Sequence, residues 1–400
     1  MFEIEGSYAT AKCFATQVEE AAIEQIRTMC DTPFTEGCSV RIMPDVHAGK
    51  GCTIGTTMTI RDKVVPNVVG VDIGCGMYTV KLEADELDLA LVDKACHTVP
   101  SGFSVWEGRR KRFDLTQLTC FRELKDTVRV ERSIGTLGGG NHFIEVDRAS
   151  DGTYYLVIHS GSRNLGTQVA SFYQRLAVDM HSGMREYYEE RDRIIAQMKA
   201  EGRRKEIQGV LRQLKTGRTE PDVTPDLCWL EGSHLEDYLH DVALCQQYAR
   251  LSRETMAEVI AEVTGLQMGE SFHTIHNYID TDELILRKGA IAAHKDELVL
   301  IPLNMRDGSV LARGRGNEDW NFSAPHGAGR VLSRTAAKRE LSLEEYRRQM
   351  EGIYTTCVTE STLDEAPGAY KSREDIIGPI AESVDIVDEL KPVYNFKATG

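Results

Sequence analysis

The sequence has no cysteine pair with Cys-x-x-Cys spacing, although ten of its 400 residues are cysteines. Zinc ribbons and thioredoxin-like redox sites are therefore disfavoured. The longest apolar stretches, such as 298–303, fall far short of the ~20 residues that a membrane-spanning helix needs. Residues 1–17 also lack the basic start and apolar run of a secretory signal. We therefore expect a cytoplasmic protein with reduced thiols and no membrane association.

The chain also lacks an excess of basic residues. Its 62 Asp and Glu outnumber its 47 Lys and Arg, so the formal net charge is −15. Such a chain does not coat nucleic acid through bulk charge, but this does not exclude a local basic groove. Hydrophobic residues make up 41% and charged residues 27% of the chain, as in folded globular proteins. A chain of this length buries a large core without disulfides.

Strands and helices are predicted to alternate irregularly along the chain. Runs rich in Val, Ile and Thr between glycines predict strands at 51–60, 64–73, 77–82, 141–147, 154–159, 284–290 and 297–302. Helical patterns cover 169–214, 234–263, 342–356 and 372–389, with a loop at 216–225 and a short tail at 393–400. This order predicts one large α+β domain over residues 1–400, with mixed β-sheets and a projecting helical arm at about 169–225.

Five glycine-flanked segments carry side chains that can bind a metal ion or a phosphate. The first, PNVVGVDIGCGM (66–77), places Asp72 and Cys75 on a tight turn. Glycines let the backbone approach a ligand closely there, and the two side chains could point at one metal ion. A strand end with a capping Asp and a buried Cys is an equally good interpretation of this segment alone.

The second segment is GGGNHFIE (138–145). In an extended strand Asn141, Phe143 and Glu145 share one face, while His142 and Ile144 share the other. Taken alone, this pattern favours a core histidine beside a glycine turn.

Three further segments each present a histidine. VIHSGSRNLG (157–166) ends a predicted strand at His159 and continues to Arg163, a combination that could cradle a phosphate. In SFHTIHNY, His273 and His276 would face opposite ways on a strand, so at most one is expected to be a ligand. In SAPHGAGRVLS (323–333) small residues leave His326 open to a large reactant. One carboxylate, one thiolate and several imidazoles dispersed along the chain favour a transition-metal site over a structural zinc site.

These segments resemble the RtcB family of RNA ligases. The strings MPDVHAGKG, VGVDIGCGM, GTLGGGNHFIE, HSGSRNLG, HNY and PHGAGR follow one another in the family's order from 43 to 330, and Lys397 also fits. The resemblance implies an enzyme that joins RNA 3′-phosphate or 2′,3′-cyclic phosphate ends to 5′-hydroxyl ends. It further implies GTP, two Mn²⁺ ions, a histidine–GMP intermediate and an RNA end activated as RNA–ppG.

The resemblance also implies residue roles. Cys75 would bridge both metal ions, with Asp72 and His142 completing one site and His159 and His276 the other. His326 would become guanylylated. The implied nucleotide contacts are Asn141, His142, Phe143, Ile144, Glu145, His276, Asn277, Pro302, Leu303, Asn304, Met305, Ser309, His326, Gly327, Ala328, Gly329 and Lys397. Candidate RNA phosphate contacts are Arg163, Arg313, Arg315 and Arg330.

One segment departs from the family pattern. Many members have a PGSMG-like loop before the nucleotide-contacting serine, whereas this chain has PLNMRDGS (302–309). Leu303 and Asn304 replace small residues, and Arg306 and Asp307 add charge, as expected of a divergent branch with its own substrate.

Two other functions compete with the RNA ligase. A dinuclear metal phosphoesterase acting on RNA ends would use the same ligands without a nucleophilic histidine. A non-catalytic RNA-binding protein could keep the fold alone. The sequence identifies neither the RNA nor an activating protein partner, and we expect a monomer.

Overall fold

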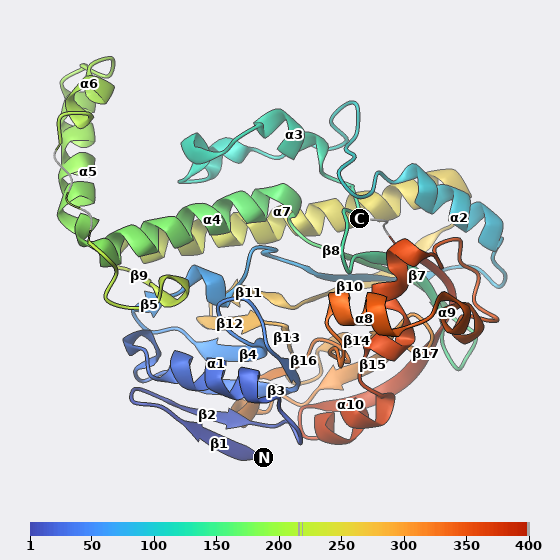
Figure 1. Cartoon of the computed structure of the whole chain (residues 1–400). Coiled ribbons are helices and arrows are strands. Elements are labelled where there is room, and N and C mark those ends of the chain that lie inside the picture. Colours follow the sequence, from blue (N-terminus) through green and yellow to red (C-terminus); the bar gives the residue numbers. More distant parts are fainter. Residues whose placement is uncertain (215–216, 218, 398–400) are drawn as a thin grey trace.

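The computed structural model describes residues 1–214, 217 and 219–397 and shows an α+β fold. Two large sheets lie beneath a pair of long helices, α4 (Arg163–Asp179) and α7 (Ser233–Thr264), which run side by side (Figure 1). In the described ranges no helix is long and apolar enough to cross a bilayer. All ten cysteines are free thiols.

The first sheet has the strand order β1-β2-β3-β4-β12-β11. Its strands are β1 (Phe2–Glu5), β2 (Thr10–Cys13), β3 (Val40–His47), β4 (Ile54–Thr59), β12 (Ile285–Lys288) and β11 (Asn277–Asp280). Only β2 and β3 pair in parallel, because helix α1 (Glu20–Cys30) carries the chain back between them. That helix buries Ile26 and Met29 in the core.

The second sheet is antiparallel, with the order β10-β6-β8-β7-β17-β15-β14. Its strands are β10 (Met268–Ile275), β6 (Gly76–Leu82), β8 (Tyr154–Ser160), β7 (Phe143–Arg148), β17 (Val384–Lys397), β15 (Gly308–Gly314) and β14 (Leu298–Asn304). Gly76 pairs with Ile275 on one side and with Ser160 on the other. Phe143 pairs with His159. This register brings the ends of β10 and β8 and the starts of β6 and β7 to one edge.

The other elements are short. Two small ladders join β5 (Lys63–Val64) to β9 (Leu230–Glu231) and β13 (Ala290–Ala292) to β16 (Ser323–Pro325). The shorter helices are α2 (Leu89–Thr98), α3 (Thr127–Arg132), α8 (Arg334–Glu340), α9 (Leu343–Gln349) and α10 (Arg373–Ile380). Helices α2 and α7 cover the second sheet, where Ile144, Ile158 and Met256 share a buried cluster.

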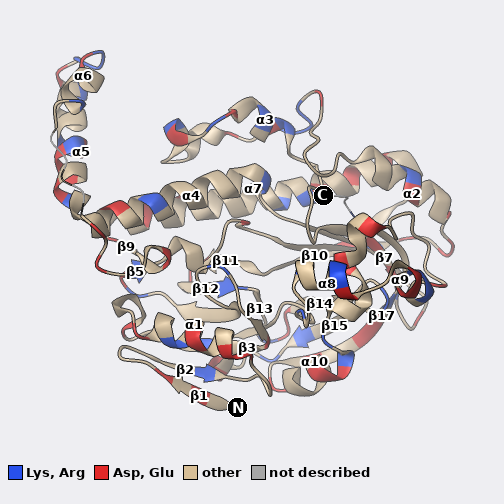
Figure 2. Cartoon of the chain, in the orientation of Figure 1, with Lys and Arg blue, Asp and Glu red and all other residues tan. Residues whose placement is uncertain are grey.

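The helical arm starts later than the sequence predicts. Helix α4 buries Leu165, Val169 and Tyr173 and so belongs to the body of the protein. The chain kinks in the π-helical turn Met180–Met184, where Gly183 has φ +76°. From there α5 (Arg185–Ala200) and α6 (Ile207–Leu211) project outward, with charges of both signs along them (Figures 1 and 2).

Three predicted elements are wrong in part. The strand at 64–73 is instead the two residues of β5 followed by a 3-10 turn, Pro66–Val68, because Pro66 lacks an N–H and Gly70 (φ +96°) turns the chain. The helix at 342–356 ends with α9 at Gln349. The helix at 372–389 ends at Ile380, and β17 continues through the predicted tail to Lys397. Within the predicted loop and tail, residues 216, 218 and 398–400 lie outside the described part.

A buried ion network fastens the end of β17. Lys397 Nζ lies 2.7 Å from Glu365 Oε2, and Arg330 and Arg334 lie 2.6 and 2.7 Å from Glu365 Oε1. Burial favours protonation, but the charges of Lys397, Arg330 and Arg334 outweigh it and lower the pKa of Glu365 to about 2. This carboxylate therefore stabilises the fold above its unfolded pKa of about 4.3.

We expect Glu365→Gln to lower the free energy of unfolding by about 3 kcal/mol near neutral pH, because it leaves the buried Lys397 without its carboxylate partner. The difference in unfolding free energy between the wild type and the variant should shrink as pH falls from about 5 towards 3, because the wild type then also loses the stabilisation by ionised Glu365. Urea unfolding at about pH 7 and pH 3.5 measures both values. Glu360→Gln, at an exposed position of the same 3-10 turn, is the matched control. An equal deficit at both pH values would contradict the assignment.

Candidate functional site

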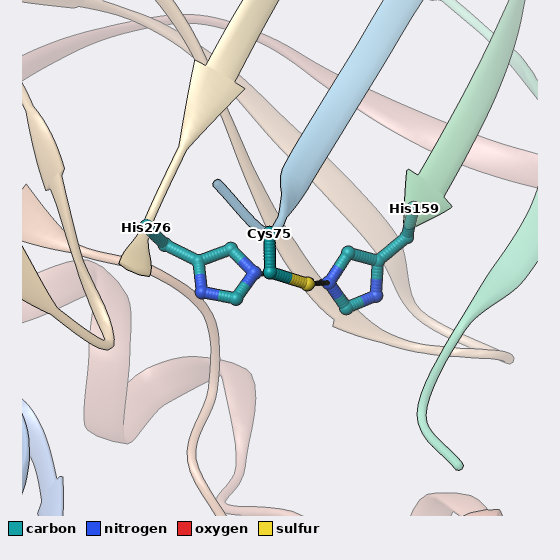
Figure 3. Close-up of side chains that lie close together, drawn as sticks. All are labelled: Cys75, His159 and His276. Carbon is teal, nitrogen blue, oxygen red and sulfur yellow. Dashed lines mark hydrogen bonds between the residues drawn. The ribbon is translucent and has the colours of Figure 1, made fainter. Parts of the chain in front are cut away.

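Two groups of ligand atoms meet at the sheet edge, and Cys75 belongs to both. Cys75, His159 and His276 form one group, and Asp72, Cys75 and His142 form the other, with the ligand atoms of each group within 4.8 Å of one another. Cys75 lies between the imidazoles of His159 and His276 (Figure 3). Its Sγ is 3.3 Å from His159 Nε2 and 3.4 Å from His142 Nε2. The structure thus brings together all five predicted metal ligands.

Glycines permit this close approach. Asp72 and Cys75 lie on the turn before β6, where Gly74 has φ +76°. A Cβ on Gly161 would lie 2.1 Å from Asp72 Oδ1, so a larger residue there would displace the carboxylate. Gly161 is therefore needed to keep Asp72 in place at the cluster.

Burial sets the protonation of the ligands. It lowers the pKa of His159 and His276 well below the ordinary value, so both imidazoles are neutral and offer lone pairs. The Nε2 atoms of these two rings lie only 2.9 Å apart. Burial and the charge of Asp72 raise the pKa of the Cys75 thiol. A bound cation reverses that preference, since metals bind the thiolate.

Backbone carbonyls orient two of the rings. His142 Nδ1 lies 2.9 Å from the Leu137 carbonyl, and His159 Nδ1 lies 3.2 Å from the Asn141 carbonyl. A hydrogen at Nδ1 leaves the Nε2 lone pair for a metal ion. One thiolate, three imidazoles and one carboxylate form a donor set that fits divalent transition metals.

A buried guanidinium joins two ligand-bearing segments. Arg253 of α7 donates to the carbonyls of Gly74 and Ser160, each at 2.7 Å. Those residues directly precede Cys75 and follow His159.

His273 stacks on Tyr78 with ring centroids 4.4 Å apart, away from the cluster. Of the two histidines in SFHTIHNY, only His276 belongs to the cluster.

A cavity of about 290 Å³ opens beside the cluster and contains His326. The ring centroids of His326 and His276 are 4.9 Å apart. His326 Nδ1 lies 2.7 Å from Asp45 Oδ2, and the backbone N–H of His326 donates to the same oxygen. Asp45 is fully buried. No role is predicted for Asp45 from the sequence, although it belongs to the string MPDVHAGKG.

Most of the predicted nucleotide contacts line this cavity. Those that do are Asn141, Phe143, Glu145, His276, Pro302, Leu303, Asn304, Met305, His326, Gly327, Ala328, Gly329 and Lys397. His142 lies at the cluster instead, Ile144 is buried in the core, and the Asn277 side chain accepts a hydrogen bond from Gly289. Ser309 is buried within β15. Glu145 is also buried, and burial together with the charge of Asp147 raises its pKa.

An open cleft of about 760 Å³ lies on the other side of the cluster and is lined by Asp72, His142 and Arg163. Arg163 has φ 56°, and its guanidinium occupies the place that a Cβ on Gly138 would take. The other three predicted RNA contacts lie elsewhere. Arg330 lines the cavity of His326, while Arg313 donates to the Asp296 carbonyl and Arg315 pairs with Asp385.

Known proteins resemble this chain over nearly its whole length. A family model described as tRNA-splicing ligase RtcB matches residues 25–126 and 119–398. RNA-splicing ligase RtcB of Escherichia coli K12 is 30% identical over 427 aligned residues, covering 95% of each chain. RNA-splicing ligase RtcB1 of another Escherichia coli strain is 31% identical with the same coverage. tRNA-splicing ligase RtcB of Archaeoglobus fulgidus is 27% identical, covering 94% of this chain and 91% of the relative. By these matches the chain belongs to the RtcB family of RNA-splicing ligases.

Proposed function

We propose that this protein is an RNA ligase that uses GTP and two Mn²⁺ ions to join a 3′-phosphate or 2′,3′-cyclic phosphate end to a 5′-hydroxyl end. The observation that carries the proposal is the placement of His326. Its imidazole stands in a cavity beside the five-residue cluster, with Asp45 on Nδ1. The names of the relatives, RNA-splicing and tRNA-splicing ligase, support the choice of RNA as substrate.

The residues suit two metal ions that share Cys75. Asp72 and His142 would hold one ion, and His159 and His276 the other. The ions would neutralise phosphate charge and orient the leaving group. Zn²⁺ competes strongly for thiolate and imidazole ligands, whereas Mn²⁺ stands near the bottom of the affinity series. The choice of Mn²⁺ rests on the family resemblance.

His326 would be the nucleophile. Asp45 accepts the Nδ1 hydrogen and so keeps the lone pair on Nε2. That nitrogen would attack the α-phosphorus of GTP, forming a P–N bond as the bond to pyrophosphate breaks. An oxygen of the RNA 3′-phosphate would next displace His326 to give RNA–ppG. The 5′-hydroxyl would then lose its proton and attack the RNA phosphorus, releasing GMP. A cyclic phosphate end would first be opened by water.

The neighbouring polar groups would select the base. Glu145 and Lys397 line the same cavity, and a guanine presents N–H donors and a carbonyl acceptor to such a pair. A phosphoesterase acting on RNA ends would use the same cluster, but it would need neither the Asp45–His326 pair nor a nucleotide cavity. The arrangement of His326 therefore favours the ligase.

We expect intact wild-type protein to gain the mass of one GMP after incubation with Mn²⁺ and GTP, and His326→Ala to gain none, because the P–N bond needs Nε2. Intact-protein mass spectrometry measures both. His47→Ala, a variant of another histidine lining the cavity, is the control and should still gain the mass. No gain by metal-loaded wild type would favour the phosphoesterase, and hydrolysis of a 2′,3′-cyclic phosphate would then be tested.

We expect Asp45→Asn to slow guanylylation by roughly a hundredfold or more, because an amide does not hold the nucleophilic tautomer of His326. Single-turnover mass measurements with Mn²⁺ and GTP give the rate. The metal content of the variant should match that of the wild type, since Asp45 is not one of the clustered ligands. Guanylylation at the wild-type rate would show that Asp45 only supports the loop.

A further inference from the structure

The open cleft beside the cluster carries an exposed aromatic side chain that the proposed chemistry does not use. Phe103 is 88% exposed and lines this cleft. Val128 of α3, which follows the cleft-lining Asp126, is 49% exposed. An aromatic ring exposed in a cleft is suited to stacking against a nucleic-acid base.

The charges around Phe103 indicate what this surface binds. Lys125 and Arg129 line the cleft, and neither has an acidic side-chain partner within 4 Å in the part of the chain that the structure describes. Arg129 instead donates to the carbonyl of Phe103. The nearby Asp126 caps α3 by accepting from the Arg129 N–H. In a chain of net charge −15, two unpaired cations beside an aromatic ring favour a polyanion with stackable rings.

The cleft is continuous with the cluster. Asp72 and His142 belong to the metal-ligand groups and also line the cleft. The cavity of His326 opens beside His159 and His276 of the same cluster. A strand lying in the cleft would therefore bring its end to the cluster, next to the cavity of His326.

We propose that Phe103 is the stacking platform for an unpaired base of the RNA substrate near the end to be joined, and that Lys125 and Arg129 hold the flanking phosphates. This inference rests on the proposed function, because it takes the strand in the cleft to be the RNA that is ligated. Stacking tolerates every base, since each has a π-face. The cleft would thus position an RNA end without selecting its sequence.

The test measures RNA binding separately from guanylylation. We expect Phe103→Ala to bind a short, dye-labelled single-stranded RNA roughly tenfold more weakly by fluorescence anisotropy, and Phe103→Trp to restore binding. Phe2→Ala, a variant of another exposed Phe on β1, should bind like the wild type. Guanylylation uses no RNA, so its failure in the wild type would count against the proposed function and not against this cleft.

RNAs with one abasic nucleotide identify stacking. We expect one abasic position near the joined end to weaken wild-type binding and to leave Phe103→Ala unaffected, because the same contact is already lost. Equal binding by Phe103→Ala and the wild type would overturn the proposal. The proposal would also be overturned if Phe103→Ala bound every abasic RNA more weakly than the wild type does. That result would indicate a loop defect or a surface for a protein partner.

The phosphate contact has its own signature. We expect Lys125→Ala to weaken RNA binding at low salt and to lower the slope of log affinity against log salt concentration by about 0.7, the value for one single-strand phosphate. Lys111→Ala is the control, because Lys111 pairs with Glu258 and does not line the cleft. An unchanged slope in Lys125→Ala would remove this residue from the phosphate contacts.

Discussion

The pairing of Gly76 with both Ile275 and Ser160 is the constraint on which the site depends. Successive residues of a strand point to opposite faces, so a slip of one residue would turn His159 away from Cys75. The cluster therefore depends on the register of the antiparallel strands β10, β6, β8 and β7. Arg253 reinforces this register from α7 by binding the carbonyls beside two of the ligands.

The same edge separates two environments. On one side a small cavity holds His326, and the ion network around Glu365 and Lys397 closes its wall. On the other side an open cleft presents cations and an exposed ring. A nucleophilic side chain must be held in one orientation by the groups around it. Asp45 and the ion network around Glu365 provide such groups for His326. A polymer end needs access, which the open side gives.

The sequence predicted the site better than the fold around it. Glycine-flanked motifs made Asp72, Cys75 and His159 candidate ligands, and the resemblance to the RtcB family supplied the ligand set that the structure brings together. Strand alternation placed Asn141 and Glu145 on one face, and both line the cavity of His326. These features are predictable because tight turns and strand alternation depend on residues that are neighbours in the sequence.

Elements that depend on distant partners were missed or mistaken. Residues 384–389 of β17 are predicted as helix, yet they form a strand because β15 pairs with 384–390. Strand β7 pairs with the rest of β17, residues 391–397. Helix α4 was assigned to the arm because its pattern continues into α5, whereas its contact with α7 assigns it to the body. Asp45 lies in the string MPDVHAGKG, but only its contact with His326 shows what it does. Phe103 lies in no quoted motif, and only its place in the cleft reveals it.

Two openings onto one cluster also affect how the nucleotide and the strand enter and leave the site. A nucleotide exchanging through the cavity of His326 need not pass a strand lying in the cleft, so loading of the protein and delivery of the polymer can proceed by separate routes. With a single entrance the nucleotide and the strand would compete for the same opening, and each catalytic cycle would have to begin with neither of them bound. Separate routes let a protein already loaded with nucleotide bind its next pair of RNA ends. They also let a strand stay bound in the cleft while the nucleotide is loaded.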